Sequence, residues 1–256
     1  MTSVPISNEV RSNLQRLNVG AAILHGVQAI IVIVAANDFK LPVTTFFLND
    51  APGKGLDPTR LTQQFDVRIA WGIFGFLALS SLFHAIASVG RGRTAYLAEL
   101  SAGRNRFRWV EYSLSSTLMI LMIAMVFGIT EITALIGIAG ANVSMILFGW
   151  IMEVVNEPGK PVWFTPFWFG CIAGVVPWIA LVIYLFGPGS DMPNFVYGVF
   201  VSIFIFFNLF ALNQWLQYKQ VGKWRDYIFG ERAYLILSLS AKSALAWQIF
   251  GNTLAA

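Results

Sequence analysis

The sequence predicts an all-α bundle of seven transmembrane helices, and three observations lead to this fold class. First, 57% of the 256 residues are hydrophobic and only 12% are charged, about half the charged fraction of a typical soluble domain. Second, the hydrophobic residues gather in runs of the length that a helix needs to cross the hydrocarbon core, about 20 residues. Third, charged residues, prolines and glycines lie mostly between these runs. We therefore expect a multi-pass integral protein of the cell membrane, in contact with the lipid bilayer.

Seven runs meet the length requirement. Prolines or glycines follow the first, second, fourth and fifth runs, whereas only Gly128 to Glu131 separate the third run from the fourth. The segment before the first run contains Glu9, Arg11 and Arg16 and lacks the pattern of a cleaved signal peptide, so we expect a retained helix. No internal repeat is visible, which gives an inverted-repeat transporter no support. We predict one seven-helix membrane domain over residues 1–256, with helices at 14–36, 66–89, 107–128, 131–153, 163–186, 194–218 and 229–251.

The basic residues outside these helices predict the orientation, because cytoplasmic loops carry an excess of lysine and arginine. The side that holds the N-terminus contains most of them: Arg11, Arg16, Arg91, Arg93, Arg104, Arg106, Arg108, Lys160, Lys219, Lys223, Arg225 and Arg232. The opposite side contains Lys40, Lys54, Arg60 and Arg68. We expect a cytoplasmic N-terminus and an extracellular C-terminus. The net charge is +4, but the basic residues are distributed around the hydrophobic runs as membrane topology requires, so we expect no nucleic-acid partner.

The first extracellular connection, residues 37–65, is too long for a simple turn. Its segment from Leu41 to Leu48 is rich in β-branched and aromatic residues, and turn-forming pairs follow at 49–50 and 52–53. This pattern predicts a short β-hairpin on the outer surface, as a lid or a subunit contact. An irregular solvated loop fits so short a signal equally well.

Lys242 lies deep inside the last expected helix, in the apolar stretch from Leu235 to Phe250. A lysine at the centre of a membrane helix costs about 2.5–3.5 kcal/mol on insertion scales, so it is seldom accidental. Apolar residues extend about two turns in both directions, and the side chain cannot easily reach water. Burial favours a neutral amine, which is able to condense with an aldehyde. The structural alternative is an ion pair that pins two helices together.

Glu111 is the natural partner of this lysine. It lies between one and two turns inside the third expected helix. A buried cation needs a nearby anion to keep its proton, and one carboxylate with one lysine leaves little residual charge in the bundle. The alternative is that Glu111 faces the membrane interface and pairs with Arg104 or Arg108.

Polar residues on three expected helices predict an internal cavity. The only two histidines, His25 and His84, both fall within membrane segments. Gln28 shares a helix face with His25, and Ser80 shares one with His84. Ser238 lies one turn before the lysine of the last helix. These groups are suited to accept or relay a proton, although a lone histidine in a helix is more often a structural group.

Aromatic residues make up 15% of the chain and are frequent in the last three expected helices. Many of them are expected to face lipid, and Trp163 and Trp215 lie at span ends, where interfacial belts form. Trp168, Trp178 and Phe206 lie deeper. We predict that these three rings clamp a long, mostly apolar ligand.

Seven helices with a lysine in the last and a carboxylate in the third resemble a retinal-binding rhodopsin. The cytoplasmic N-terminus and the long first extracellular connection resemble the heliorhodopsin family. The likeness extends over the whole chain, and its most specific parts are the motif from Ser238 to Ser243 and the motif from Arg108 to Tyr112.

This resemblance implies all-trans retinal bound as a Schiff base to Lys242, with Glu111 as its counterion and Ser238 and Tyr112 close by. It implies photoisomerisation, then proton transfer into a polar cavity. It also implies a homodimer with the outer loop at or near the interface. The role of Glu153, near the end of the fourth expected helix, stays open. The cavity residues implied by the resemblance are His25, Gln28, Ser80, His84 and Asn105.

The favoured function is light sensing without ion pumping. A proton pump needs an acceptor and a donor on opposite sides of the bound chromophore, and the third helix offers Glu111 but no further carboxylate over residues 112–130. The fifth and sixth helices carry no charge in their interiors, which disfavours a polar pore. A light-driven proton pump or channel is the alternative, since water and hydroxyl side chains also carry protons.

A third class is a transporter or scaffold without retinal, in which Lys242 and Glu111 form a plain ion pair. No metal-ligand spacing, phosphate-binding loop or catalytic triad is apparent, so we expect neither a metal site nor an enzyme. The basic connection from Arg91 to Arg108 is a candidate contact for lipid headgroups or for an unidentified cytoplasmic signalling partner.

Overall fold

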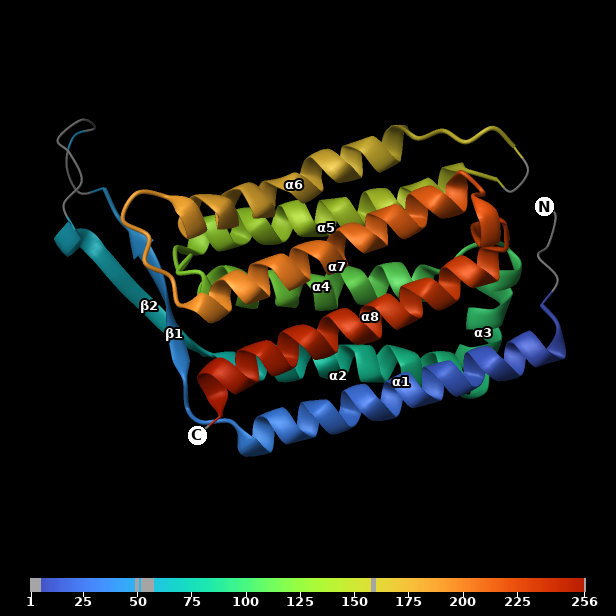
Figure 1. Ribbon diagram of the computed structural model, residues 1–256, viewed down its shortest axis with the longest axis horizontal. Helices are drawn as coiled ribbons and strands as arrows, with labels where there is room; N and C mark the ends of the chain where they lie inside the picture. The colour runs from blue at the N-terminus through green and yellow to red at the C-terminus, as the bar shows by residue number, and fades with distance from the viewer. Residues whose placement is uncertain (1–5, 49–50, 52–57, 158–159, 256) are drawn as a thin grey trace.

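Seven long helices lie side by side in the computed structural model, which describes residues 6–48, 51, 58–157 and 160–255 (Figure 1). A two-stranded hairpin stands at one end of the bundle, the hairpin end, and a short helix lies at the other, the α3 end. Within the described residues, seven helices are long and apolar enough to cross a membrane. These are α1 (Asn8–Ala35), α2 (Ile69–Ser88), α4 (Arg106–Val126), α5 (Ile132–Val155), α6 (Thr165–Phe186), α7 (Asn194–Tyr218) and α8 (Tyr227–Ile249), which continues as the π-helical turn η3 (Phe250–Leu254). The predicted fold class is confirmed.

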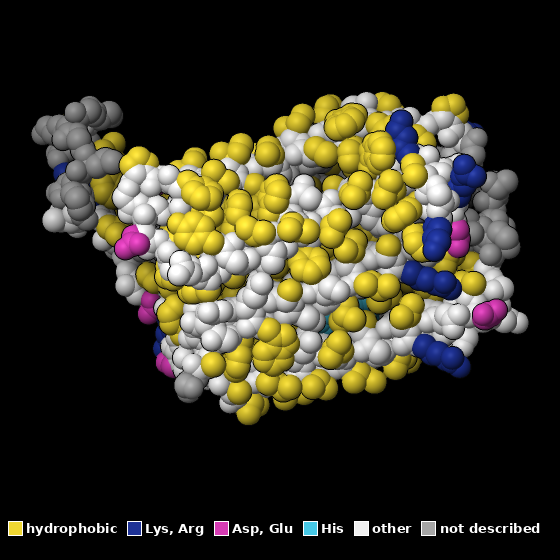
Figure 2. Space-filling view, viewed as in Figure 1, with side chains coloured by type: hydrophobic (Ala, Val, Ile, Leu, Met, Phe, Trp, Pro, Cys, Tyr) yellow, Lys and Arg dark blue, Asp and Glu magenta, His cyan; other side chains and the backbone are white. Residues whose placement is uncertain are grey.

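The surface has the polarity of an integral membrane protein. On the face shown in Figure 2, apolar side chains cover the middle of the bundle, and lysine and arginine side chains gather at the α3 end. The exposed apolar residues include Ile30 on α1 and Ile172 on α6, which expose 61% and 66% of their surface. The hydrocarbon core of a lipid bilayer stabilises such an apolar surface, whereas water does not. The chain is therefore a multi-pass integral membrane protein.

Helices α1 and α2 depart most from the starts that the hydrophobic runs predict, and the others begin within two residues of them. Helix α1 begins at Asn8 and not at residue 14, because the Ser7 hydroxyl caps it by accepting a hydrogen bond from the Val10 amide at 3.2 Å. Helix α2 begins at Ile69 and not at residue 66. The residues before it belong to strand β2 (Leu61–Arg68).

Helix α3 (Gly90–Ser101) occupies the segment that the sequence predicts as a basic connection. It packs Tyr96 and Leu100 against Ile6, Leu14 and Ile228, together with Ala87, in a small apolar cluster at the α3 end. Its composition is polar overall, so hydropathy alone does not reveal it. The buried side of α3 therefore closes this end of the bundle.

The predicted hairpin is confirmed, with strand β1 (Lys40–Phe46) antiparallel to β2. Lys40 pairs with Arg68 at one end of the register and Phe46 with Leu61 at the other, with an irregularity after Val43. The short 3₁₀ turn η1 (Pro58–Arg60) precedes β2. The turn-forming pairs predicted at 49–50 and 52–53 lie outside the described residues.

Backbone hydrogen bonds join the hairpin end to the bundle. The Thr44 amide donates to the Thr130 carbonyl at 2.9 Å, which ties β1 to the connection between α4 and α5. That connection is tight because Gly128 adopts a φ of 89°, a left-handed conformation that favours glycine. The Asn37 amide donates to the Leu254 carbonyl at 3.0 Å and joins the end of α1 to the end of α8.

The main apolar core fills the half of the bundle nearer the hairpin. It contains Ile73 and Phe76 of α2, Ile123 of α4 and Leu245 and Ile249 of α8, all essentially inaccessible. Toward the α3 end, polar and charged side chains enter the interior. The buried polar residues there include Asn18, His25, Ser80, Asn105, Arg108, Glu111, Glu153, Glu231, Ser238 and Lys242.

Candidate functional site

A buried ion pair links α8 to α4. The Lys242 Nζ donates a hydrogen bond to Glu111 Oε1 at 2.7 Å and to the Ser238 hydroxyl at 2.8 Å. The side chains of the lysine and the glutamate are 4% and 5% exposed. Glu111 thus faces the interior and pairs with Lys242, and not with Arg104 or Arg108 at the interface. The pair compensates both charges, which burial would otherwise make very costly.

Two serines hold this ion pair in place. The Ser80 hydroxyl of α2 donates to Glu111 Oε1 at 2.6 Å, so this oxygen accepts from both the serine and the lysine. Ser238 lies four residues before Lys242, one turn away on the same face of α8. The Tyr112 ring lies 5.2 Å from the Lys242 nitrogen, and its hydroxyl donates to the Tyr234 carbonyl at 3.0 Å. Residues of three helices, α2, α4 and α8, therefore hold the ion pair.

The two histidines lie side by side. The rings of His25 and His84 stack with centroids 5.9 Å apart and an angle of 13° between their planes. The amide nitrogen of Asn18 donates to the Leu14 carbonyl at 2.9 Å, which turns the Asn18 oxygen toward His84 Nδ1 at 2.8 Å. In a neutral ring Nδ1 therefore carries the hydrogen and Nε2 keeps its lone pair. His84 is set up to take a proton at Nε2.

A narrow cavity, here called the polar cavity because charged and amide side chains line part of its mainly apolar wall, extends from Glu111 toward the α3 end. Glu111 and His84 line it at one end, and Asn105, Arg108 and Glu231 line it further along. Asn105 is thus part of this cavity but does not contact Lys242. Tyr96 of α3 lines it too; burial and the nearby Glu231 raise the pKa of that phenol well above its usual range. Gln28 lies apart and exchanges hydrogen bonds of 3.0 and 3.1 Å with Ser243, the neighbour of Lys242.

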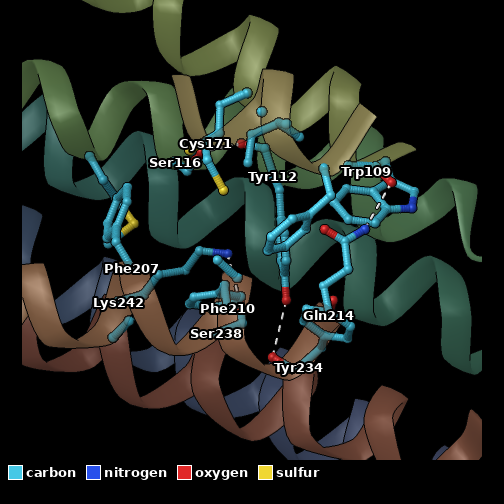
Figure 3. Close-up of a pocket in the computed structure, with 18 residues that line it drawn as sticks. Trp109, Tyr112, Ser116, Cys171, Phe207, Phe210, Gln214, Tyr234, Ser238 and Lys242 are labelled. Atoms are coloured by element: carbon cyan, nitrogen blue, oxygen red, sulfur yellow. Dashed lines mark hydrogen bonds between the residues drawn. The ribbon is translucent and has the colours of Figure 1, made fainter. Parts of the chain in front are cut away.

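A larger, mostly apolar cavity begins at Lys242 and is enclosed by α4, α5, α6, α7 and α8 (Figure 3). The empty space between its walls, including space open to the outside, is about 840 Å³. The lysine side chain extends from α8 into this space, and the Cys171 thiol points into it from α6. Its other walls include Trp109, Tyr112, Met145, Phe167, Phe207, Phe210 and Tyr234.

The three rings predicted to clamp a ligand lie outside the first layer of this cavity. Trp168 is 56% exposed on the outer face of α6, because the side chain of its neighbour Phe167 turns inward instead. Trp178 is buried and packs edge-on against Phe207, which does line the cavity, with ring centroids 5.6 Å apart. Phe206 packs against the main core. The sequence indicates the right helices but does not show which face of each points inward.

Two glycines shape the cavity. A Cβ atom at Gly149 would lie 2.5 Å from the Trp109 ring, so only glycine lets this ring lie directly against α5. A Cβ at Gly170 would lie 3.3 Å from Phe148 Cβ, which is a tight contact between α5 and α6. Both glycines line the cavity, so the close packing at these two positions forms part of its wall.

A second buried charge cluster, the Arg108 cluster, lies at the α3 end and consists of Arg108, Glu153 and Glu231. The guanidinium of Arg108 bonds to both carboxylates. It also lies 3.9 Å from the Tyr234 ring centroid and 4.5 Å from that of Trp109. The sequence gives only a weak signal for this cluster, because each of the three residues lies near the end of a membrane span, where charged residues normally face the interface. Arg108, which the sequence places among the basic residues at this surface, is in fact buried.

Solved structures of rhodopsins are similar to this fold. The transmembrane domain of the rhodopsin phosphodiesterase from Salpingoeca rosetta matches with a TM-score of 0.66 and 12% identity, over 97% of this chain and 88% of that one. Cyanorhodopsin from the cyanobacterium Tolypothrix sp. NIES-4075 matches with a TM-score of 0.56 and 12% identity, over 97% and 96%. A thermophilic rhodopsin gives 0.56 and 14%, over 94% and 90%. At such low identity these likenesses show the fold alone.

A family comparison carries the assignment further. No curated protein matches the chain significantly. The family model described as Heliorhodopsin, however, matches residues 14–254, from α1 to the end of η3. A rhodopsin family implies a retinal chromophore and, in general terms, a photoreceptor. Because the match extends over nearly the whole chain, this protein belongs to the heliorhodopsin family.

Proposed function

We propose that this protein is a light sensor that binds all-trans retinal on Lys242 and does not pump ions. One observation carries the proposal: Lys242 lines the mostly apolar cavity, and its nitrogen lies 2.7 Å from Glu111, a residue that lines the polar cavity. An amine in this position is able to hold an apolar aldehyde on one side. On the other side it has polar groups that take up a proton.

The residues of the apolar cavity fit retinal. Its aromatic and aliphatic walls suit a long conjugated hydrocarbon. The buried amine is the group that an aldehyde needs for a covalent bond. When bound to Lys242 through a Schiff base, retinal supplies visible absorption and a double bond that isomerises in light. Tyr112, Phe207 and Phe210 would contact the bound polyene, since all three line the cavity near the lysine.

Glu111 has the position of the counterion. Its negative charge beside Lys242 stabilises a proton on that nitrogen, because an opposite charge within a few ångströms favours the charged form. Ser80 and Ser238 hold the two partners by hydrogen bonds of 2.6 and 2.8 Å. The proton therefore stays on the nitrogen in the dark.

Replacing Glu111 by glutamine tests this role. The amide keeps the size of the side chain but removes the anion, so we expect the retinal-loaded variant to lose most of its visible band at neutral pH. The absorption should move to the near ultraviolet and return to the visible on acidification. Glu157→Gln is the matched control, because Glu157 is exposed and pairs with Lys160 at the surface. An unchanged visible band in Glu111→Gln would exclude Glu111 as the counterion.

The polar groups around Lys242 are distributed unevenly, and this favours a sensor over a pump. Glu111, His84 and Asn18 line the cavity on the side toward the α3 end. Toward the hairpin end, the described interior next to α8 is mainly the apolar core that includes Leu245 and Ile249. Among the described residues that line the two cavities, the titratable groups closest to this ion pair, Glu111 and His84, lie on the α3 side, where a released proton is expected to go. It therefore returns by the path on which it left.

Electrical recording separates the sensor from the pump or channel. In cells or planar membranes that contain the retinal-loaded protein, we expect continuous light to produce no steady current. A proton that moves within the cavity would give at most a brief transient when the light is switched on. A sustained photocurrent would overturn the sensor proposal and favour the light-driven pump or channel.

The same proposal includes the orientation and assembly of the chain. The lysine and arginine side chains at the α3 end favour a cytoplasmic location for that end. At the opposite end, the hairpin exposes Phe47, Leu48, Leu61 and Phe65, each by more than half of its surface. Such exposed apolar side chains support a homodimer contact through the hairpin. A cytoplasmic signalling partner would then meet the α3 end.

A further inference from the structure

The Arg108 cluster contains one guanidinium and two carboxyl groups, and its hydrogen bonds suit the ionised form of both carboxyls. Arg108 donates to Oε1 of Glu153 and to Oε1 of Glu231. Oε2 of Glu153 accepts from the Asn105 amide at 2.9 Å and from the Trp109 indole at 2.6 Å. Oε2 of Glu231 accepts from the Asn105 side-chain amide at 2.7 Å. All four oxygens thus face N–H donors, which suits two carboxylates without a proton.

The cluster therefore carries a surplus negative charge inside the protein. The Arg108 side chain is 4% exposed, and the side chains of Glu153 and Glu231 are each 2% exposed. An uncompensated charge at such a site is costly, so a protein retains it only with strong hydrogen bonding. A proton delivered to either carboxylate would leave the cluster neutral. The site is built to accept one.

Among the described residues, tyrosines and a histidine are the other titratable groups near the two carboxyl groups. Tyr96 of α3 interacts electrostatically with Glu231, as do Tyr112 of α4 and Tyr227 and Tyr234 of α8. Tyr218 of α7 interacts with both glutamates. His84 of α2 shares the polar cavity with Glu231. The cation that pairs with both carboxyl groups is Arg108. Its guanidinium remains charged at any physiological pH.

The polar cavity connects this cluster to the ion pair of Lys242. Glu111 and His84 line one part of it, and Arg108 and Glu231 line another. Glu153 does not border the cavity and lies behind Arg108. A proton that leaves the Lys242 nitrogen through Glu111 or His84 would therefore reach Glu231 first.

We propose that the Arg108 cluster is a buried proton-accepting site, with Glu231 as the carboxylate that receives the proton released from Lys242 in light. The proposal rests on the proposed function, which supplies that proton. The charges balance: the pair of Lys242 and Glu111 changes from neutral to −1 as the cluster changes from −1 to neutral. Arg108 keeps its own proton throughout. Return of the proton restores the dark state.

Infrared difference spectroscopy on the retinal-free protein gives the first test. At neutral pH we expect the cluster to be ionised, and on acidification we expect the C=O stretching band of a buried carboxylic acid to appear. Glu231→Gln should lose this band, because it leaves a neutral pair of Arg108 and Glu153. Glu153→Gln is the second variant and should also lose the band, because it leaves a neutral pair of Arg108 and Glu231. The control, Glu157→Gln, removes an exposed carboxyl and should keep the band. A band in the wild type at neutral pH that Glu231→Gln removes would show that the site is already full, and would overturn the proposal.

The retinal-loaded protein gives the second test. We expect light to produce the same carboxylic-acid band as the visible absorption is lost, and we expect Glu231→Gln to abolish the band while the pigment still forms. A light-induced band that persists unchanged in Glu231→Gln overturns the proposal. If the wild type forms no pigment at all, the proposed function fails. The acid titration of the retinal-free protein then still decides whether the cluster is an ionised proton acceptor.

Discussion

Replacing Lys242 by alanine is expected to abolish the visible absorption of the protein after incubation with all-trans retinal. The nitrogen of Lys242 is the amine that lies at the end of the apolar cavity, with the Glu111 carboxylate 2.7 Å away and Ser238 at 2.8 Å. Without it, retinal has no covalent attachment in the cavity and no nitrogen there to carry the proton of a Schiff base. The expected measurement is a spectrum with a strong visible band for the wild type and only the near-ultraviolet band of free retinal for the variant.

Two further variants make this experiment decisive. Lys242→Ala leaves Glu111 buried without its cation, which is destabilising in itself. The double variant Lys242→Ala with Glu111→Gln removes both charges, and it should fold and remain colourless. Lys219→Ala replaces a lysine near the surface, next to the Phe164 ring, and should keep the visible band. A visible band in the double variant would show that retinal is attached elsewhere. A colourless wild type would leave Lys242 as a structural ion pair.

Replacing Arg108 by glutamine is expected to cost about 3–5 kcal/mol of folding free energy, the usual cost of removing one partner of a buried ion pair. The substitution leaves Glu153 and Glu231 close together without their cation. It also removes the contacts of the guanidinium with the Trp109 and Tyr234 rings. Unfolding in a denaturing detergent, followed by circular dichroism, measures the loss.

The neighbouring residue Arg106 provides a matched control on the same helix. It pairs with Glu99 at 2.5 Å, but its side chain is 62% exposed, so Arg106→Gln should cost less than about 1 kcal/mol. A triple variant that changes Arg108, Glu153 and Glu231 to glutamine removes all charges of the cluster and should recover much of the stability. Equal losses for the Arg106 and Arg108 variants would show that burial does not strengthen the Arg108 cluster.

The sequence predicts the fold and the central ion pair because both depend on strong, local signals. Long apolar runs identify membrane helices, since lipid requires a continuous apolar surface. A lysine and a glutamate inside such runs stand out for the same reason, and the structure places Lys242 against Glu111. The two histidines are also brought together, because α1 and α2 pack side by side.

Other features depend on tertiary contacts that periodicity does not reveal. Trp168 faces outward although it lies deep in α6, because its neighbour Phe167 takes the inward position. Glu231 lies near the start of α8, where a charge normally meets water, and only the packing of α3, α4 and α5 around that end buries it. Helix α3 is likewise polar in composition and is held by the contacts of Tyr96 and Leu100.

The two ends of the bundle are closed in different ways. At the hairpin end, main-chain bonds from Thr44 to Thr130 and from Asn37 to Leu254 do not depend on protonation. At the α3 end, Asn105 caps α4 and at the same time bonds to a carboxylate of α5 and to one of α8. One residue therefore bonds to carboxyl groups of two helices and caps a third. If the proposed function holds, a change of charge at this end would act on the start of α4, whereas the main-chain bonds at the hairpin end would not respond to it.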